Sequence, residues 1–151
     1  MSLIITLDKG ISIDSGLKDK LQSIVSLIFR EEGLVDSEIN LRILDDEEMK
    51  KLNHKFRKKN KTTDVLTFVN PIKNNKNVNE TYCDIFFSAE TIKKDAKKNM
   101  INFYDHITHL MIHCFLHVNG YDHKKENDFI MMKNLEEKIL MKFNLESPYL
   151  V

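Results

Sequence analysis

The chain has 151 residues, 42% of them hydrophobic and 30% charged, and its formal net charge is zero. This composition is typical of a globular protein, predicts a single domain over residues 1–151, and excludes a global charge that would attract a polyanion. The start, MSLIITLDKG, lacks the features of a signal peptide, and no apolar stretch approaches the roughly 18 residues that span a bilayer, so we expect a cytoplasmic protein with no membrane contact.

The first part of the chain predicts two strands and two helices. Apolar residues alternate at 3–7 and 39–44, as in half-buried strands. Between these strands, apolar residues recur at helical spacing over 17–28, and Gly33 is a suitable helix stop. The acidic run at 45–48 suits the positive end of a helix dipole, so we expect a short helix through Leu52.

The second part predicts two more strands and three helices. Residues 65–69 and 82–87 are rich in β-branched and aromatic side chains, and the asparagine-rich stretch 74–80 connects them as a loop. Ser88 is a suitable N-cap for the first of the helices. The helices are predicted at residues 89–99, 103–118 and 126–143. The fold class is therefore α+β, with a small mixed sheet packed against helices.

Three histidines form the pattern that carries most chemical information. His113 and His117 lie one helical turn apart, so both imidazoles can project from one helix face. Gly120 can then end the helix in a left-handed conformation, and His123 follows where the returning chain could approach from the side. This arrangement predicts one metal ion on the three imidazoles, at a helix end.

Another histidine pair has the same spacing. A histidine stripe at 106, 109, 113 and 117 runs beside an apolar stripe at 107, 110, 111, 114 and 118. His109 therefore competes with His113 as a ligand. Gly120 and His123 favour the pair His113 and His117, because those two are nearest the returning chain.

The donor set suggests zinc with catalytic chemistry. Three imidazoles suit zinc, although nickel or copper would also bind them. Structural zinc sites usually close with four protein ligands, whereas three histidines and an open fourth position are typical of a catalytic site. A fourth ligand from Cys83 or Asp84 would reverse this interpretation. The spacing also matches metzincin proteases, but Cys114 stands where their general-base glutamate would be.

A basic run precedes the central strands. Residues 50–61, KKLNHKFRKKNK, contain seven Lys or Arg residues and no acidic one. The run could be an ordinary solvated helix end and loop, or a surface that contacts phosphates. The charge pattern alone does not decide between them.

The stretch from His113 to His123 resembles the HGxLHLxGYDH signature of the YbeY family of endoribonucleases that mature ribosomal RNA. Upstream, Leu52-Asn53, Phe56-Arg57 and the segment 63–68 (TDVLTF) are similar to the family's LN..(Y/W)R…TDVLSF pattern. Further likenesses lie in Asp84-Ile85, Met131 or Met132, Leu135-Glu136 and the tail segment Glu146 to Tyr149. The resemblance covers most of the chain from about Leu52 onward.

The resemblance implies a zinc-dependent endoribonuclease, selective for single strands, that acts in 16S rRNA 3'-end maturation and ribosome quality control. It assigns one zinc to His113, His117 and His123 and a functionally important role to Arg57. Single-stranded or ribosomal RNA and the small ribosomal subunit would be its partners. An arginine within a lysine-rich patch is a suitable phosphate ligand, because its planar fork can make bidentate contacts. Arg57 would then stabilise charge that develops during cleavage.

Two departures from the family pattern concern cysteines. Cys114 and Cys83 replace two glycines, which places two thiols near the predicted site. One hypothesis is that they lie close together and tune or obstruct metal access. We expect both to be reduced.

Two other functions remain open at this point: a metalloprotease-like hydrolase, and a non-catalytic ribosome-assembly factor whose fold zinc braces. The general base is not identified either. Four carboxylates could orient a ligand histidine: Asp64, Asp84, Asp105 and Asp122.

Overall fold

A computed structural model describes residues 2–32, 38–71, 81–118 and 126–142. In chain order, its elements are β1 (Ser2–Leu7), α1 (Ser15–Glu32), β2 (Glu38–Leu44), α2 (Asp46–Arg57), β3 (Val65–Pro71), β4 (Thr81–Ser88), α3 (Ala89–Lys98), α4 (Phe103–Val118) and α5 (Glu126–Lys142). None of the helices within the described ranges has the length and apolar character needed to cross a membrane.

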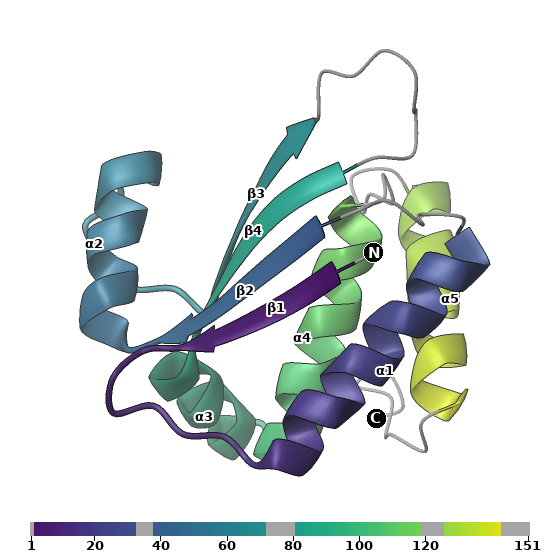
Figure 1. Ribbon diagram of the computed structural model, residues 1–151, viewed down its shortest axis with the longest axis horizontal. Coiled ribbons are helices and arrows are strands. Elements are labelled where there is room, and N and C mark those ends of the chain that lie inside the picture. Colours follow the sequence, from purple (N-terminus) through teal and green to yellow (C-terminus); the bar gives the residue numbers. More distant parts are fainter. Residues whose placement is uncertain (1, 33–37, 72–80, 119–125, 143–151) are drawn as a thin grey trace.

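The strands form one mixed sheet in the order β1-β2-β4-β3 (Figure 1). β1, β2 and β4 are parallel, and β3 runs antiparallel to β4 at an edge. Helix α1 connects β1 to β2, as parallel neighbours require a crossover connection. The predicted α+β class and the small mixed sheet are therefore confirmed.

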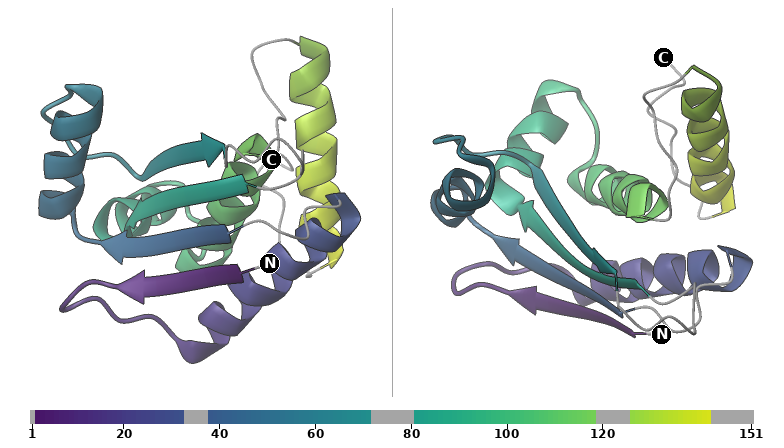
Figure 2. Two further views of the ribbon diagram at one scale, coloured as in Figure 1. Left: turned by 45° about the horizontal axis from the view of Figure 1, so that its top comes forward. Right: turned by 90° about the horizontal axis from the view of Figure 1, so that it is seen from above.

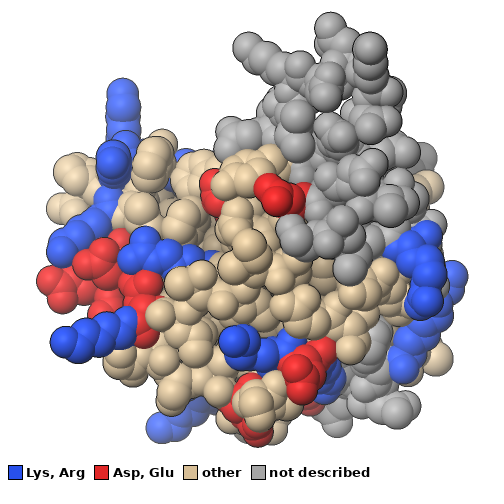
Figure 3. All heavy atoms as spheres, viewed as in Figure 1, with Lys and Arg blue, Asp and Glu red and all other residues tan. Residues whose placement is uncertain are grey.

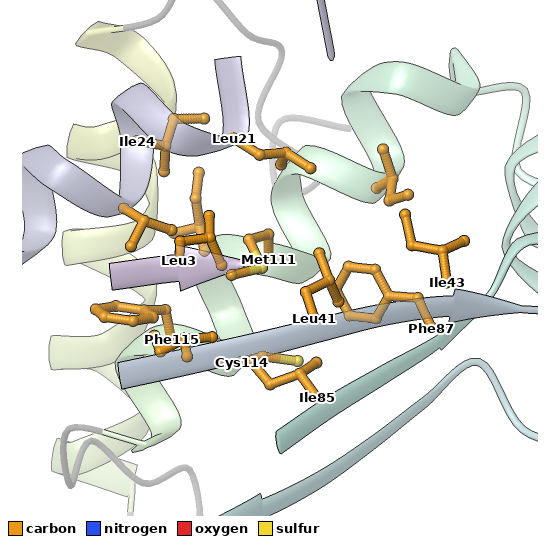
Figure 4. Packing of buried hydrophobic residues seen from close by; sticks show 14 of the residues in the cluster. Leu3, Leu21, Ile24, Leu41, Ile43, Ile85, Phe87, Met111, Cys114 and Phe115 are labelled. Atoms are coloured by element: carbon orange, nitrogen blue, oxygen red, sulfur yellow. The ribbon is translucent and has the colours of Figure 1, made fainter. Parts of the chain in front are cut away.

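One face of the sheet carries the main core. Strand alternation turns Leu41, Cys83, Ile85 and Phe87 toward this face, where all four are buried. Residues of α1, α3, α4 and α5 complete the same cluster. Figure 2 shows how these helices are arranged around the sheet, and Figure 4 shows Leu21 of α1 and Met111 of α4 among the buried side chains. Burying a large apolar side chain contributes roughly 1.5–3 kcal/mol. The cluster thus fixes α4 against the sheet, and with it the histidines of that helix.

The other face is covered in part by α2. Met49 of α2 packs with Leu44 and Leu66, and all three are buried. Phe68 and Phe86 extend this second cluster. The helix that carries the histidines, α4, therefore packs on one face of the sheet, and the helix of the basic run, α2, packs on the other.

Helix α2 is longer than the sequence predicted. It begins at the predicted place, where Asp45 accepts a hydrogen bond from the Glu48 backbone at 2.9 Å. It continues beyond Leu52 to Arg57 and ends at Lys58, which adopts a left-handed conformation with φ of 56°. Glycine is the usual residue there, so a lysine gave no stop signal. Arg57 is consequently the last helical residue and has a fixed backbone.

Helix α4 has the predicted bounds but is buried on more of its surface than predicted. Ile107, Met111 and Cys114 face the core as expected. Thr108, Ile112, Phe115 and Leu116 are buried as well. The reason is that α4 contacts α1, α3 and α5, as well as sharing the main core with the sheet. The stripe with His109 and His113 is only partly exposed.

A partly buried carboxylate, that of Asp46, joins α2 to α3. Oδ1 of Asp46 accepts hydrogen bonds from Ser88 at 2.5 Å, Thr91 at 2.5 Å and Thr62 at 3.1 Å. Oδ2 lies 3.5 Å from the ammonium of Lys94. Burial raises the pKa of Asp46, but the hydrogen bonds from these hydroxyls and from Lys94 outweigh it, so the pKa lies below its ordinary value of 3.8.

We expect Asp46→Ala to lower the free energy of unfolding by about 2 kcal/mol at neutral pH, because it leaves the buried Ser88 hydroxyl without its acceptor. A carboxylate with a lowered pKa stabilises the fold above its ordinary pKa, and the effect is lost as pH falls through the folded value. Urea unfolding at neutral and acidic pH measures this. The control, Glu47→Ala on exposed α2 surface, should change stability by less than about 0.5 kcal/mol; an equal effect of both substitutions would contradict the expectation.

Candidate metal centre and adjoining basic groove

Helix α4 carries two of the three predicted metal ligands. His113 lies on its second half with 34% of its side chain exposed. The backbone of His117 follows one turn later. The side chain of His117 and all of His123 lie outside the described residues, as does Gly120. Within the described part of the chain, no group of three potential ligands comes together.

The side chain of His113 contacts a buried carboxylate of α5. Its Nδ1 atom forms a hydrogen bond with Oε1 of Glu136. The other carboxylate oxygen, Oε2, lies 3.1 Å from Nε2 of His109. Glu136 has no exposed side-chain surface. One carboxylate therefore bridges two successive histidines of the predicted stripe.

These contacts distinguish the two competing histidines. His109 directs Nε2, its outermost nitrogen, to Glu136, whereas His113 directs Nδ1 to it. A histidine whose Nδ1 is held by a carboxylate ligates metals through Nε2. The geometry therefore favours His113 over His109 as the ligand.

Glu136 was not among the carboxylates predicted to orient a ligand. A signal was present, because Glu136 is spaced three and four residues from Ile139 and Leu140, both buried. A glutamate on the buried side of a helix needs a partner. Leu135-Glu136 carried part of the family resemblance, but the residue's partner on α4 could not be read from the sequence.

The described residues include three of the four carboxylates that were predicted to orient a ligand histidine: Asp64, Asp84 and Asp105. Asp64 accepts hydrogen bonds from the Val65 backbone at 2.8 Å and the Thr63 hydroxyl at 3.2 Å. Asp105 lies in the first turn of α4, two turns before His113. Asp122 lies outside the described residues.

Asp84 does not fit the role of a fourth metal ligand. Its neighbours Cys83 and Ile85 face the core that contains α4. Because side chains alternate along a strand, Asp84 faces the opposite side of the sheet. The interpretation that Asp84 could close the metal site is therefore wrong.

The two cysteines are part of the core. Both are free and buried, and Figure 4 shows Cys114 against Ile85 of the sheet. Burial raises the pKa of both thiols to about 12, and for Cys114 the Thr67 side chain acts in the opposite direction. Both thiols therefore remain protonated at neutral pH, and a thiolate ligand at Cys83 is disfavoured.

A further histidine of the stripe, His106, is partly buried and has a buried ring nitrogen. Within the described residues, Nε2 of His106 is a buried nitrogen that has no hydrogen-bond partner. Burial, and then the nearby His109, lower the pKa of His106, although Asp95 and Asp64 act in the opposite direction. His106 is therefore neutral at physiological pH.

A groove of about 660 Å³ lies along the edge strand β3 and the end of α2. Its polar lining comes from Asn53, Arg57, Lys59, Lys61, Thr63 and Thr67. Asn53 is buried and donates to the carbonyl of Lys61 at 2.8 Å, which fixes the loop that carries the lysines. At the left of the surface in Figure 3, over α2, Lys and Arg side chains lie beside a group of Asp and Glu side chains. Residues of the basic run 50–61 thus line one side of this groove.

Arg57 is held at the edge strand. A guanidinium nitrogen donates to the Thr67 carbonyl at 3.4 Å, and the guanidinium carbon lies 5.6 Å from the centre of the Phe68 ring. Thr67 pairs with the buried Ile85 on the core face of the sheet, and Ile85 packs with Cys114, the residue after His113. Thr67 therefore links the groove that contains Arg57 to the helix that contains the histidines.

These features define an α+β protein with a histidine stripe on a core helix and a cationic groove at the edge of the sheet, two elements suited to hydrolysis of a phosphate-containing substrate. The family model for "Endoribonuclease YbeY" matches residues 4–144. The chain belongs to the YbeY family of endoribonucleases, as the sequence resemblance predicted.

Individual relatives agree with this assignment. An endoribonuclease YbeY of Bartonella quintana is 39% identical over 116 residues, which cover 76% of this chain and 73% of the relative. One from Agrobacterium fabrum is 37% identical over 113 residues, covering 74% and 67% of the two chains. The solution structure of the Thermotoga maritima protein TM1509 aligns with a TM-score of 0.62 and 26% identity, over 95% of this chain and 92% of that one.

Proposed function

We propose that this protein is a zinc-dependent endoribonuclease that cleaves single-stranded RNA during 16S rRNA 3'-end maturation and ribosome quality control. The observation that carries the proposal is the contact between His113 and the buried Glu136, in a chain of an endoribonuclease family. A ligand histidine whose second nitrogen meets a carboxylate is the usual arrangement around catalytic metals.

The proposed zinc ligands are His113, His117 and His123. The donor chemistry fits zinc, because imidazoles held by carboxylates are strong ligands for it. Bound zinc would supply Lewis acidity toward the scissile phosphate and lower the pKa of a bound water. His113 and His117 would hold the ion on one helix face, and Glu136 would orient the first of them.

The groove would bind the RNA backbone. Lys59 and Lys61 line it and would contribute salt-dependent affinity for phosphates. The proposed catalytic residue is Arg57, which would stabilise charge developing on the phosphate. Its link through Thr67 to α4 supports a location near the histidines.

Selectivity for single strands has support on the same surface. Phe56 is 53% exposed, and its ring centre lies 5.2 Å from that of Phe68, beside Arg57. Unpaired bases stack on exposed aromatic rings, whereas bases inside a duplex cannot reach them. The ribosomal small subunit, in the cytoplasm, would supply such a strand.

Removal of metal should abolish cleavage of a single-stranded RNA, and one equivalent of zinc should restore it. The assay compares metal-stripped and reloaded protein on single-stranded RNA, the matching duplex and casein. Zinc that raises the melting temperature without any RNA cleavage would instead indicate a non-catalytic assembly factor. Casein digestion without RNA cleavage would indicate a protease, and unchanged RNA turnover after stripping would contradict a metal mechanism.

A further inference from the structure

We propose that Glu136 is a positioning residue that holds His113 and His109 in opposite tautomers and thereby aims Nε2 of His113 at the zinc ion. Only the part of the inference that involves the zinc ion rests on the proposed function. The arrangement of the two histidines and the carboxylate is a property of the protein itself, and it can be measured without metal.

Glu136 lies in the interior of the protein, where a carboxylate lowers the stability of the fold unless it has partners. Its side chain has no exposed surface, and Ile139 and Leu140 on the same helix belong to the main core. Burying a carboxylate is unfavourable unless hydrogen bonds compensate it, and apolar residues of similar size often stabilise such positions more. The contacts with the two histidines therefore compensate for the burial of the carboxylate, and we look to them for its function.

The tautomers follow from hydrogen-bond chemistry. An ionised carboxylate can only accept, so the ring nitrogen that faces it must carry the hydrogen. His113 faces Glu136 with Nδ1 and His109 faces it with Nε2. A neutral imidazole carries one N–H, so the lone pair lies on Nε2 in His113 and on Nδ1 in His109. Two histidines one turn apart on the same helix are thus fixed in opposite states.

The opposite states give the two histidines different roles. The lone pair of His113 is on the outer nitrogen, which suits a metal ligand. His109 commits its outer nitrogen to the second carboxylate oxygen at 3.1 Å, so it restrains rotation of the carboxylate. His109, which the sequence alone left as a competing ligand, is then a support for His113.

The first test is the tautomeric state of the metal-free protein by 15N NMR in mildly alkaline buffer. We expect the Nδ1–H form for His113 and the Nε2–H form for His109, with His54, exposed on α2, as the reference for a solvated ring. The signals are assigned with His113→Gln and His109→Gln. The same tautomer in both histidines would overturn the proposal.

The second test is zinc affinity, measured by competition with a chromophoric chelator. Glu136→Gln should weaken zinc binding by about 10–100-fold, because it removes the charge and one acceptor. The matched control is Glu137→Gln, one residue along α5 and partly exposed, which should bind zinc as wild type does. Equal affinities in the two variants would overturn the role of Glu136.

Substitutions of His109 separate positioning from folding. In His109→Gln the amide nitrogen can replace Nε2 as donor, so affinity should stay within a few-fold of wild type. His109→Leu removes the donor and should weaken zinc binding more than His109→Gln does; equal affinities would overturn the support role. Thermal unfolding of each metal-free variant checks the fold, and if Glu136→Gln does not fold, the wild-type tautomers and the two His109 variants still decide. Absence of zinc binding by wild-type protein would instead overturn the proposed function.

Discussion

Replacing His117 by alanine is expected to remove bound zinc and reduce RNA cleavage by roughly 10³-fold. His117 lies one helical turn after His113 on α4, whose bounds are fixed by packing against the sheet and three helices. A catalytic metal supplies several kcal/mol of transition-state stabilisation, and about 1.4 kcal/mol corresponds to tenfold in rate. Metal analysis of the purified variant and a single-turnover cleavage assay measure the two losses.

The control for this variant is His54→Ala. His54 is exposed on α2, on the side of the sheet opposite the histidine stripe, and should be replaceable without loss of zinc or activity. Circular dichroism of both proteins checks that the helices are intact. Full zinc content in His117→Ala would remove His117 from the ligand set, and wild-type cleavage without zinc would remove zinc from the reaction.

Replacing Arg57 by alanine is expected to lower the cleavage rate by about 10²–10³-fold while the zinc content stays unchanged. The guanidinium is exposed at the edge of the groove and contacts the Thr67 carbonyl and the face of Phe68. Surface substitutions of this kind usually change stability by less than about 0.5 kcal/mol. Arg57→Lys should recover only part of the rate, because lysine keeps the charge but loses the planar fork.

Lys59→Ala is the matched control, since Lys59 lines the same groove. A lysine that contacts the RNA backbone should affect KM and the salt dependence of binding, with little change in kcat. An Arg57→Ala variant that behaves in this same way would make Arg57 a binding residue. Loss of zinc from Arg57→Ala would mean that the residue supports the fold instead.

Local patterns in the sequence predicted most of the fold. Alternation located the first two strands, and β-branched and aromatic residues located the other two. Ser88 was correctly predicted as the N-cap of α3, where its hydroxyl accepts from the Thr91 backbone. The end of α2 was missed, because the residue that adopts the left-handed cap is Lys58 and not a glycine. Where a helix ends depends on the conformation of a single residue, which the residue type alone does not specify.

The candidate site was predictable only where its residues are neighbours in sequence. The spacing of His113 and His117 follows from the geometry of one helix. The contact between His113 and Glu136 joins two helices and depends on how α4 and α5 pack, so no local pattern contains it.

The position of Asp84 shows the same limit in a strand. A carboxylate is a suitable metal ligand. Only the pairing of β4 with its neighbours shows that Asp84 faces away from α4 and its histidines. Cys114 is similar, because its thiol packs on the sheet while the adjacent His113 faces α5. Adjacent residues on a helix point about 100° apart, so nearness in sequence did not make the thiol part of the site.

The most direct test of the account is the metal content of the protein expressed without a histidine tag and purified without chelators. Elemental analysis should find one zinc per chain, and the same preparation of a variant with His113, His117 and His123 all replaced by alanine should contain none. A wild-type protein without a transition metal, or equal zinc in both preparations, would contradict the three-histidine centre and the chemistry built on it.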